Sequence, residues 1–92
     1  MATVVMYTTP WCGYCAAAKE LLRSKGVEFV DINVDTDAAL RQEMMDKSNG
    51  RTVPQIFINN EPVGGYTDIV ALEEQGKLES LLNQEINQEN NK

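Results

Sequence analysis

Histidine is absent from the sequence, and cysteine occurs only twice, at Cys12 and Cys15. A structural zinc ion takes about four protein ligands, mostly cysteine and histidine. Two cysteines alone do not complete such a site within one chain. Half of a zinc site is therefore the weakest interpretation of this pair, and other chemistry must account for a spacing of three residues.

Long apolar runs are also absent. None approaches the roughly 18 residues that indicate a transmembrane helix. The N-terminus shows no basic region followed by an apolar stretch and a small-residue cleavage site, so we expect no secretion signal. Closely spaced cysteines without such a signal indicate a reducing compartment. We expect a cytoplasmic protein, or one of an organelle stroma or matrix if a transit peptide has been removed.

Positive charge is scarce and scattered. Eight Lys and Arg residues stand against 14 Asp and Glu residues, which gives a net charge of −6. Nucleic acids and anionic membranes attract clustered positive charge, so we expect neither as a partner. The 92 residues, 42% hydrophobic and 24% charged, are ordinary for one small domain. We expect that domain over residues 1–84 and a polar, frayed tail over residues 85–92.

The two cysteines lie between segments of opposite character. Residues 3–8 are apolar and β-branched, as in a buried strand, whereas residues 16–25 are strong helix formers with one apolar face. A strand that turns into this helix would place Cys12 at the helix N-terminus, where free N–H groups and the macrodipole stabilise a thiolate. Cys15, one turn later, could close a disulfide with it. The pattern favours a redox site over a structural disulfide or two inert buried cysteines.

The remaining pattern predicts an α/β fold. We expect a small four-stranded mixed sheet flanked by helices, in the order βαβ-α-ββ-αα. Asp37 should cap the second helix, Asn59-Asn60 should form a type I′ turn, and Pro62 should place the last strand at an edge. The further strands are expected over residues 28–34, 55–58 and 61–63, and the further helices over residues 38–47, from a cap at Thr67 or Asp68, and around residues 78–82.

Two further motifs are ambiguous on their residues alone. Pro54 in Thr52-Val53-Pro54 is either a turn residue or a cis proline that exposes the preceding N–H and C=O to an extended ligand. Residues 64–68, Gly-Gly-Tyr-Thr-Asp, form a turn into a helix N-terminus, which can be a simple cap or a site for a carboxylate or phosphate. The lysine and the spacing of a phosphate-binding P-loop are missing.

Taken together, three motifs resemble the glutaredoxins, specifically the small type with a two-cysteine site. They are Trp-Cys-Gly-Tyr-Cys at 11–15, Thr-Val-Pro at 52–54 and Gly-Gly-Tyr-Thr-Asp at 64–68, in the family's order and spacing. The resemblance covers residues 3–82. It implies a thioredoxin-like fold and a cis bond before Pro54.

The resemblance also implies an activity, that of a glutathione-dependent thiol–disulfide oxidoreductase acting on protein–glutathione mixed disulfides and protein disulfides. Cys12 would be the nucleophile and Cys15 the resolving thiol. The implied partners are glutathione, as co-substrate, and glutathionylated or disulfide-containing proteins. The resemblance also implies that the protein is a monomer. The implied glutathione groove consists of Tyr14, Arg41, Arg51, Thr52, Val53, Pro54, Gly65, Thr67 and Asp68.

Two positions depart from the family pattern. Thr9 stands where many relatives carry a lysine, and Arg41 or Arg51 could replace its charge. Gly13 stands where the common site has proline. A small residue there also permits an alternative function, in which a dimer holds a [2Fe-2S] cluster through Cys12 of each chain and two glutathiones, as a cluster carrier or redox sensor. Thioredoxin is disfavoured because its site has proline at the position of Tyr14.

Overall fold

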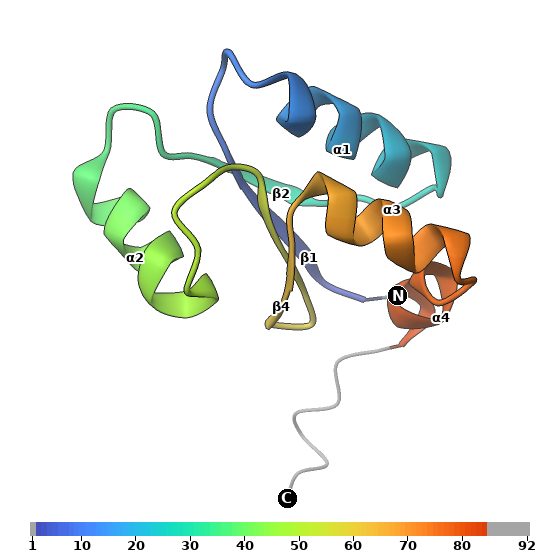
Figure 1. Cartoon of the computed structure of the whole chain (residues 1–92). Coiled ribbons are helices and arrows are strands. Elements are labelled where there is room, and N and C mark those ends of the chain that lie inside the picture. The colour runs from blue at the N-terminus through green and yellow to red at the C-terminus, as the bar shows by residue number, and fades with distance from the viewer. Residues whose placement is uncertain (1, 85–92) are drawn as a thin grey trace, which may run out of the picture.

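Strands and helices follow one another along the chain in the expected order, βαβ-α-ββ-αα (Figure 1). The computed structural model describes residues 2–84, so the tail expected over residues 85–92 lies outside the described residues. The elements in chain order are β1 (Val4–Thr8), α1 (Gly13–Ser24), β2 (Val30–Asn33), α2 (Ala38–Ser48), β3 (Gln55–Ile58), β4 (Glu61–Gly64), α3 (Tyr66–Glu74) and α4 (Leu78–Asn83).

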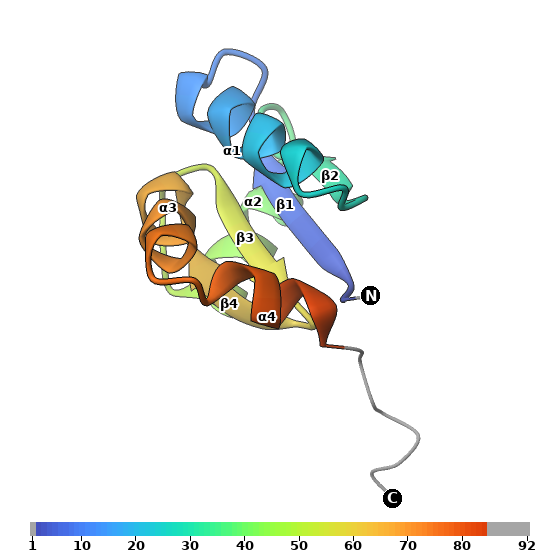
Figure 2. The same ribbon diagram turned by 90° about the vertical axis from the view of Figure 1, so that its right-hand side faces the viewer.

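The four strands form one mixed sheet in the order β2-β1-β3-β4. β1 runs parallel to β2 and antiparallel to β3, which lies beside it in the middle of the sheet (Figure 2). β4 is an edge strand, as Pro62 predicted, because proline has no N–H for a further ladder. Asn59 and Asn60 have φ of 52° and 69°, the positive values that a type I′ turn requires.

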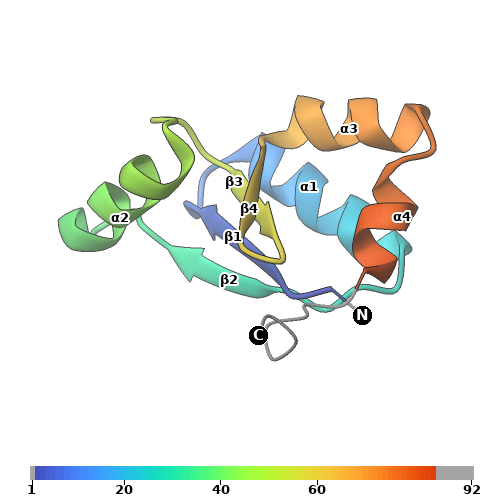
Figure 3. The same cartoon turned by 90° about the horizontal axis from the view of Figure 1, so that it is seen from below.

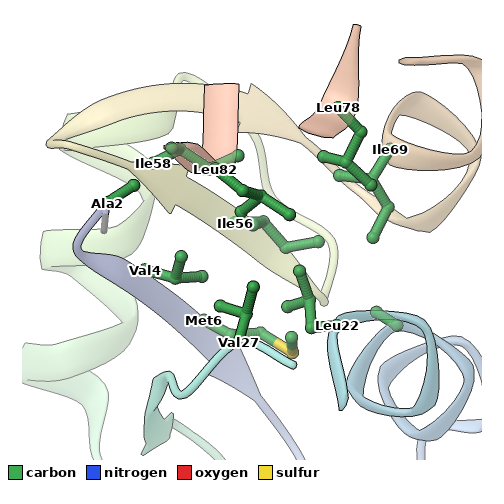
Figure 4. Close-up of a cluster of buried hydrophobic side chains, with 11 residues drawn as sticks. Ala2, Val4, Met6, Leu22, Val27, Ile56, Ile58, Ile69, Leu78 and Leu82 are labelled. Atoms are coloured by element: carbon green, nitrogen blue, oxygen red, sulfur yellow. The ribbon is translucent and has the colours of Figure 1, made fainter. Parts of the chain in front are cut away.

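Helices cover both faces of the sheet, with α2 on one side and α1, α3 and α4 on the other (Figure 3). Successive strand residues point to opposite faces, so Met6 enters one core and Tyr7 the other. The smaller core, under α2, contains Tyr7, Val34, Met44 and Phe57. The larger core (Figure 4) contains Ala2, Val4, Met6, Ala18, Leu22, Val27, Ile56, Ile58, Ile69, Leu78 and Leu82.

α1 begins at Gly13 with Cys12 as its N-cap, as the pattern around the cysteines predicted. The starts of two other elements differ from the expected ones by two or more residues. β2 is shorter than predicted because only Val30–Asn33 pair with β1. The predicted cap of α3 was wrong: Gly65 is the N-cap, and Asp68 lies in the first turn, where its carboxylate accepts a hydrogen bond from the Gly65 N–H at 2.8 Å.

A further local prediction, the cap of α2, is confirmed. Asp37 caps α2 by accepting a hydrogen bond from the Leu40 N–H at 3.0 Å. Gly26, which follows α1, has a φ of 73°, a left-handed conformation that glycine adopts without strain. Within residues 2–84, no helix combines the length and the apolar character needed to cross a membrane.

Candidate active site

The N-terminus of α1 presents Cys12 to solvent. Cys12 is the N-cap residue, with extended backbone, and its Sγ accepts a hydrogen bond from the Cys15 N–H at 3.0 Å. Cys12 is partly exposed. The backbone N–H groups and the positive end of the macrodipole therefore act on a sulfur that a substrate can reach, and both stabilise an anion. This is the arrangement that the strand–turn–helix pattern predicted.

Cys15 lies one turn further on and differs in its surroundings. It is buried, with 1% of its surface exposed, and both cysteines are free thiols in the structure. Burial is the main cause that raises the pKa of Cys15 to about 12, with a smaller contribution from a hydrogen bond to Cys12. Lys19 and the backbone at Thr9 oppose this shift only in part. At neutral pH Cys15 is therefore a protonated thiol held behind Cys12.

The segment before β3 brings a backbone carbonyl to Cys12. The Val53–Pro54 peptide bond is cis, as the resemblance implied. The Val53 carbonyl oxygen lies 3.7 Å from the Cys12 Sγ and accepts a hydrogen bond from this thiol. Residues 41 positions apart in the sequence thus meet at the Cys12 sulfur.

A groove of about 430 Å³ extends from this point to the N-terminus of α3. It brings together most of the residues expected to bind glutathione, but not Arg41, which is half-buried on α2, or the exposed Arg51. Its lining also includes Gln55, Gly64 and Tyr66, which the sequence analysis did not assign to the groove. The expected residues in its lining are Tyr14, Thr52, Val53, Pro54, Gly65, Thr67 and Asp68.

At the far end of the groove, backbone atoms and the Asp68 carboxylate pack closely together. Gly64 has a φ of 101°, and a Cβ at this position would collide with the Asp68 carboxylate. A Cβ at Gly65 would lie 3.2 Å from the carbonyl oxygen of Pro54. The two glycines therefore let a turn, a helix N-terminus and a negative side chain come together at one place. Their pairing in the sequence was the signal of this close approach.

Aromatic side chains form one wall of the groove and flank the cysteines. Tyr14 stacks on Tyr66, with ring centroids 6.0 Å apart and planes at 28°. Trp11, directly before Cys12, exposes 93% of its surface. An offset stack of this kind holds the Tyr14 ring in place although 64% of its surface is exposed.

A second cleft, of about 350 Å³, lies on the other side of the cysteines. Its lining contains Cys12 and Cys15 together with Lys19, whose Nζ lies 2.6 Å from the Asp31 carboxylate. The Thr8 hydroxyl donates a hydrogen bond to the same carboxylate. Burial favours the neutral form of Asp31, but the bonds from Lys19 and Thr8 outweigh it and lower the pKa of this carboxyl.

Many relatives carry a lysine at the position of Thr9, and the nearby cation in this structure is Lys19. Among the described residues that line this cleft, Lys19 and Arg23 are the cations, and both come from α1. The sequence analysis considered Arg41 and Arg51 instead and missed Lys19. The helical spacing offered a signal, because Lys19 follows Cys15 by four residues and therefore lies on the same face of α1.

Comparison with known proteins agrees with this geometry. The glutaredoxin family model matches residues 4–63. A glutaredoxin of Pseudomonas aeruginosa is 51% identical over 82 residues, which are 89% of this chain and 98% of that protein. The solution structure of a Brucella melitensis glutaredoxin, 51% identical, matches with a TM-score of 0.79 over 89% of each chain.

The fold agrees with that of a more distant relative as well. The crystal structure of a buckwheat glutaredoxin–glutathione complex, 27% identical, matches with a TM-score of 0.81 over 88% of this chain and 76% of that one. The expected thioredoxin-like fold is thus confirmed, together with its four-stranded mixed sheet. With the paired cysteines at the head of α1, the chain belongs to the glutaredoxin family.

Proposed function

We propose that the protein is a glutathione-dependent oxidoreductase that reduces protein–glutathione mixed disulfides and, more slowly, protein disulfides. One observation carries this proposal. The Sγ of the partly exposed Cys12 lies 3.7 Å from the carbonyl of Val53, a residue that lines the groove, while the second thiol is buried. A thiol at such a position can hold one half of a mixed disulfide in the groove and release the other half to solvent.

The first reaction needs only Cys12. Its thiolate attacks the glutathione sulfur of a mixed disulfide, a new S–S bond forms between Cys12 and glutathione, and the old S–S bond breaks. The protein thiolate leaves and takes up a proton. The thiolate of a second glutathione then attacks the sulfur of the bound glutathione and releases Cys12 with glutathione disulfide. Each cycle consumes one free glutathione, and the glutathione disulfide that leaves joins it to the glutathione of the substrate.

Protein disulfides require Cys15. Attack by Cys12 on such a disulfide gives a mixed disulfide with the substrate, and the Cys15 thiolate then attacks the Cys12 sulfur. A Cys12–Cys15 disulfide forms, the second substrate thiol leaves, and glutathione reduces the enzyme. Since burial holds the Cys15 pKa near 12, little of its thiolate is present at neutral pH, and this branch is the slower one.

The groove suits glutathione along its length. We assign the cysteinyl unit to the Val53 backbone and the γ-glutamyl carboxylate to the N–H groups of Thr67 and Asp68 at the start of α3. The Asp68 carboxylate would meet the ligand ammonium, and Tyr14 and Thr52 would form the walls. The buckwheat relative was solved as a complex with glutathione, which supports glutathione as the ligand.

The glycine carboxylate of glutathione would lie at the end nearest the cysteines. Arg51 directly precedes Thr52 and is exposed, so its guanidinium is our first candidate for this carboxylate. Arg41 is the second, although its side chain is half-buried on α2. Lys19 is less available because it already pairs with Asp31. The whole cycle requires a compartment that holds reduced glutathione, so we assign the protein to the cytoplasm. We propose that it acts there as a monomer.

A coupled assay tests the proposed function. The parent protein is given the mixed disulfide of glutathione and 2-mercaptoethanol, with either glutathione, glutathione reductase and NADPH, or thioredoxin reductase and NADPH. We expect NADPH oxidation only with glutathione. Turnover with thioredoxin reductase alone would mean that the protein is reduced as thioredoxins are and does not depend on glutathione.

A second candidate function rests on the space beside Gly13. A Cβ built at this glycine meets nothing within 4 Å, so the position next to Cys12 is uncrowded. Each chain offers one accessible thiol, and residues 2–84 contain no group of three or more potential metal ligands. Four thiolates for a [2Fe-2S] cluster would therefore come from Cys12 of two chains and from two glutathiones. When bound, such a cluster supplies one-electron redox chemistry or is cargo for transfer.

Anaerobic reconstitution with iron, sulfide and glutathione tests this candidate. We expect a coloured dimer from the parent protein, and the Gly13→Pro variant should lose the colour but keep reductase activity. A colourless monomer from the parent protein would exclude the cluster function and leave the oxidoreductase.

A further inference from the structure

Gln55 is a buried polar residue at the start of β3, and its side chain has a specific partner. Only 7% of its surface is exposed. Its Nε2 donates a hydrogen bond to the Thr52 carbonyl oxygen at 2.9 Å. Burying an amide is unfavourable unless the amide is hydrogen-bonded. The side chain therefore holds the loop before Pro54 in one position, because leaving that position would leave the buried amide without this bond.

Gly50 packs against the same amide from a second direction. A Cβ built at Gly50 would lie 2.5 Å from the Gln55 Nε2 and 3.1 Å from its Cδ. The Gly50 N–H is bonded at 3.0 Å to the Ser48 hydroxyl, which in turn donates to the Met44 carbonyl in α2. The Gln55 amide thus lies between the end of α2 and the Thr52 peptide, and no side chain larger than that of glycine fits at position 50 without moving it.

The geometry of the peptide bond passes this constraint to Val53. The Thr52 C=O and the Val53 N–H belong to one planar trans peptide, so they point in opposite directions. A Thr52 carbonyl held towards Gln55 therefore turns the Val53 N–H away from Gln55. The carbonyl of Val53 is the group that lies 3.7 Å from the Cys12 Sγ. Gln55 acts in this way on the backbone beside the reactive sulfur.

We propose that Gln55 is a positioning residue for glutathione, whose amide holds the Thr52 peptide so that the Val53 N–H is aimed at the cysteinyl unit of the ligand. The inference rests on the proposed function, in which that unit pairs with Val53. Gly50 is needed for this arrangement, because a side chain at position 50 would displace the Gln55 amide.

Binding of S-methylglutathione, which cannot form a disulfide, separates recognition from chemistry. Gln55→Met keeps an unbranched side chain of similar length but removes the donor, and Gly50→Ala keeps Gln55 but displaces its amide. We expect both variants to bind S-methylglutathione about five- to tenfold more weakly, the effect of one misdirected hydrogen bond. Gln42→Met is the matched control, because its amide bonds to Asp46 on the exposed face of α2.

A double-mutant comparison tests whether Gly50 acts through Gln55. In a Gln55→Ala background there is no amide to displace, so adding Gly50→Ala should weaken binding no further. The ¹⁵N NMR resonance of the Val53 amide should move in Gln55→Met and in Gly50→Ala but not in Gln42→Met. A residue that only stabilised the fold would lower the melting temperature without singling out Val53.

The outcomes distinguish this inference from the proposed function. If the parent protein fails to bind S-methylglutathione, the proposed function fails and the role of Gln55 fails with it. If the parent binds it and Gln55→Met binds equally well, only the inference is overturned. Equal and additive losses from Gly50→Ala in both backgrounds would also overturn it, since Gly50 would then act without Gln55. Should Gln55→Met not fold, Gly50→Ala and the Val53 resonance decide the question.

Discussion

The Cys12 Sγ accepts a hydrogen bond from the Cys15 N–H at 3.0 Å, so the second cysteine supports the first through its backbone. The Cys15 side chain is buried beneath it. One residue therefore contributes a backbone donor, which any substitution except proline keeps, and a thiol, which a single atom change removes. The two contributions can be separated by experiment.

Serine substitution should affect the two cysteines unequally. Cys12→Ser should abolish reduction of a glutathione mixed disulfide, because a serine hydroxyl stays protonated at neutral pH and is a poor nucleophile towards sulfur. Cys15→Ser should retain this activity, since its N–H still bonds to Cys12 and glutathione itself completes the cycle. The coupled NADPH assay measures both. Comparable losses in the two variants would contradict the assigned roles.

The branch that uses Cys15 should accelerate strongly with pH. Resolution requires the Cys15 thiolate, and a pKa near 12 means that its fraction rises about tenfold for each pH unit below that value. Burial is the largest cause of the shift, so it persists when Cys12 is joined to a substrate. Stopped-flow release of thiol from a Cys12 mixed disulfide between pH 7 and 9 checks this. A rate independent of pH would mean that Cys15 is deprotonated by another route.

Asp68 has two roles in the structure-based proposal, and two substitutions separate them. Asp68→Asn keeps an oxygen that can accept from the Gly65 N–H but loses the negative charge, so KM for the glutathione substrate should rise while the fold stays stable. The lost contact with the ligand ammonium should cost on the order of 1–3 kcal/mol. Asp68→Ala should raise KM equally and also destabilise the helix start by about 0.5–2 kcal/mol.

Steady-state kinetics and thermal unfolding give the two readouts for Asp68. An unchanged KM in both variants would reduce Asp68 to a helix-start residue. A KM that rises only in Asp68→Ala would assign the effect to the lost bond with Gly65 and not to charge.

The Lys19–Asp31 pair should make stability depend on acid pH. The folded-state pKa of Asp31 is lowered, so its contribution is present at neutral pH and is lost as the pH falls from about 4 through that lower value. In Asp31→Asn the free energy of unfolding should fall less between pH 7 and pH 2.5 than in the parent protein. Urea titrations at both pH values measure it, and Lys19→Met should change the pH dependence in the same direction. An unchanged difference would leave the pair without influence on folding.

Features set by neighbours along the chain could be predicted from the sequence. The bounds of β3, the positive φ at Asn59 and Asn60, and the capping of α2 by Asp37 all follow from local backbone chemistry. The order of elements and the parallel pairing of β1 with β2 follow from hydrophobic periodicity and from the handedness of the crossover. Cys12 was placed at a helix N-terminus for the same local reason.

The sequence by itself thus determined the reactive cysteines and the fold that carries them. The tertiary structure decided which side chains contact one another around the cysteines and how far the pKa of Cys15 is shifted. Gln55 holds Thr52, Lys19 joins Asp31, and Arg41 stands away from the groove, because the packing of α2 and β2 against the rest decides which side chains meet. The cis state of Pro54, which its residues alone left open, and the raised pKa of Cys15 belong to this second group. Both depend on surroundings built from segments far apart in the chain, and no local pattern encodes the burial or the distances involved.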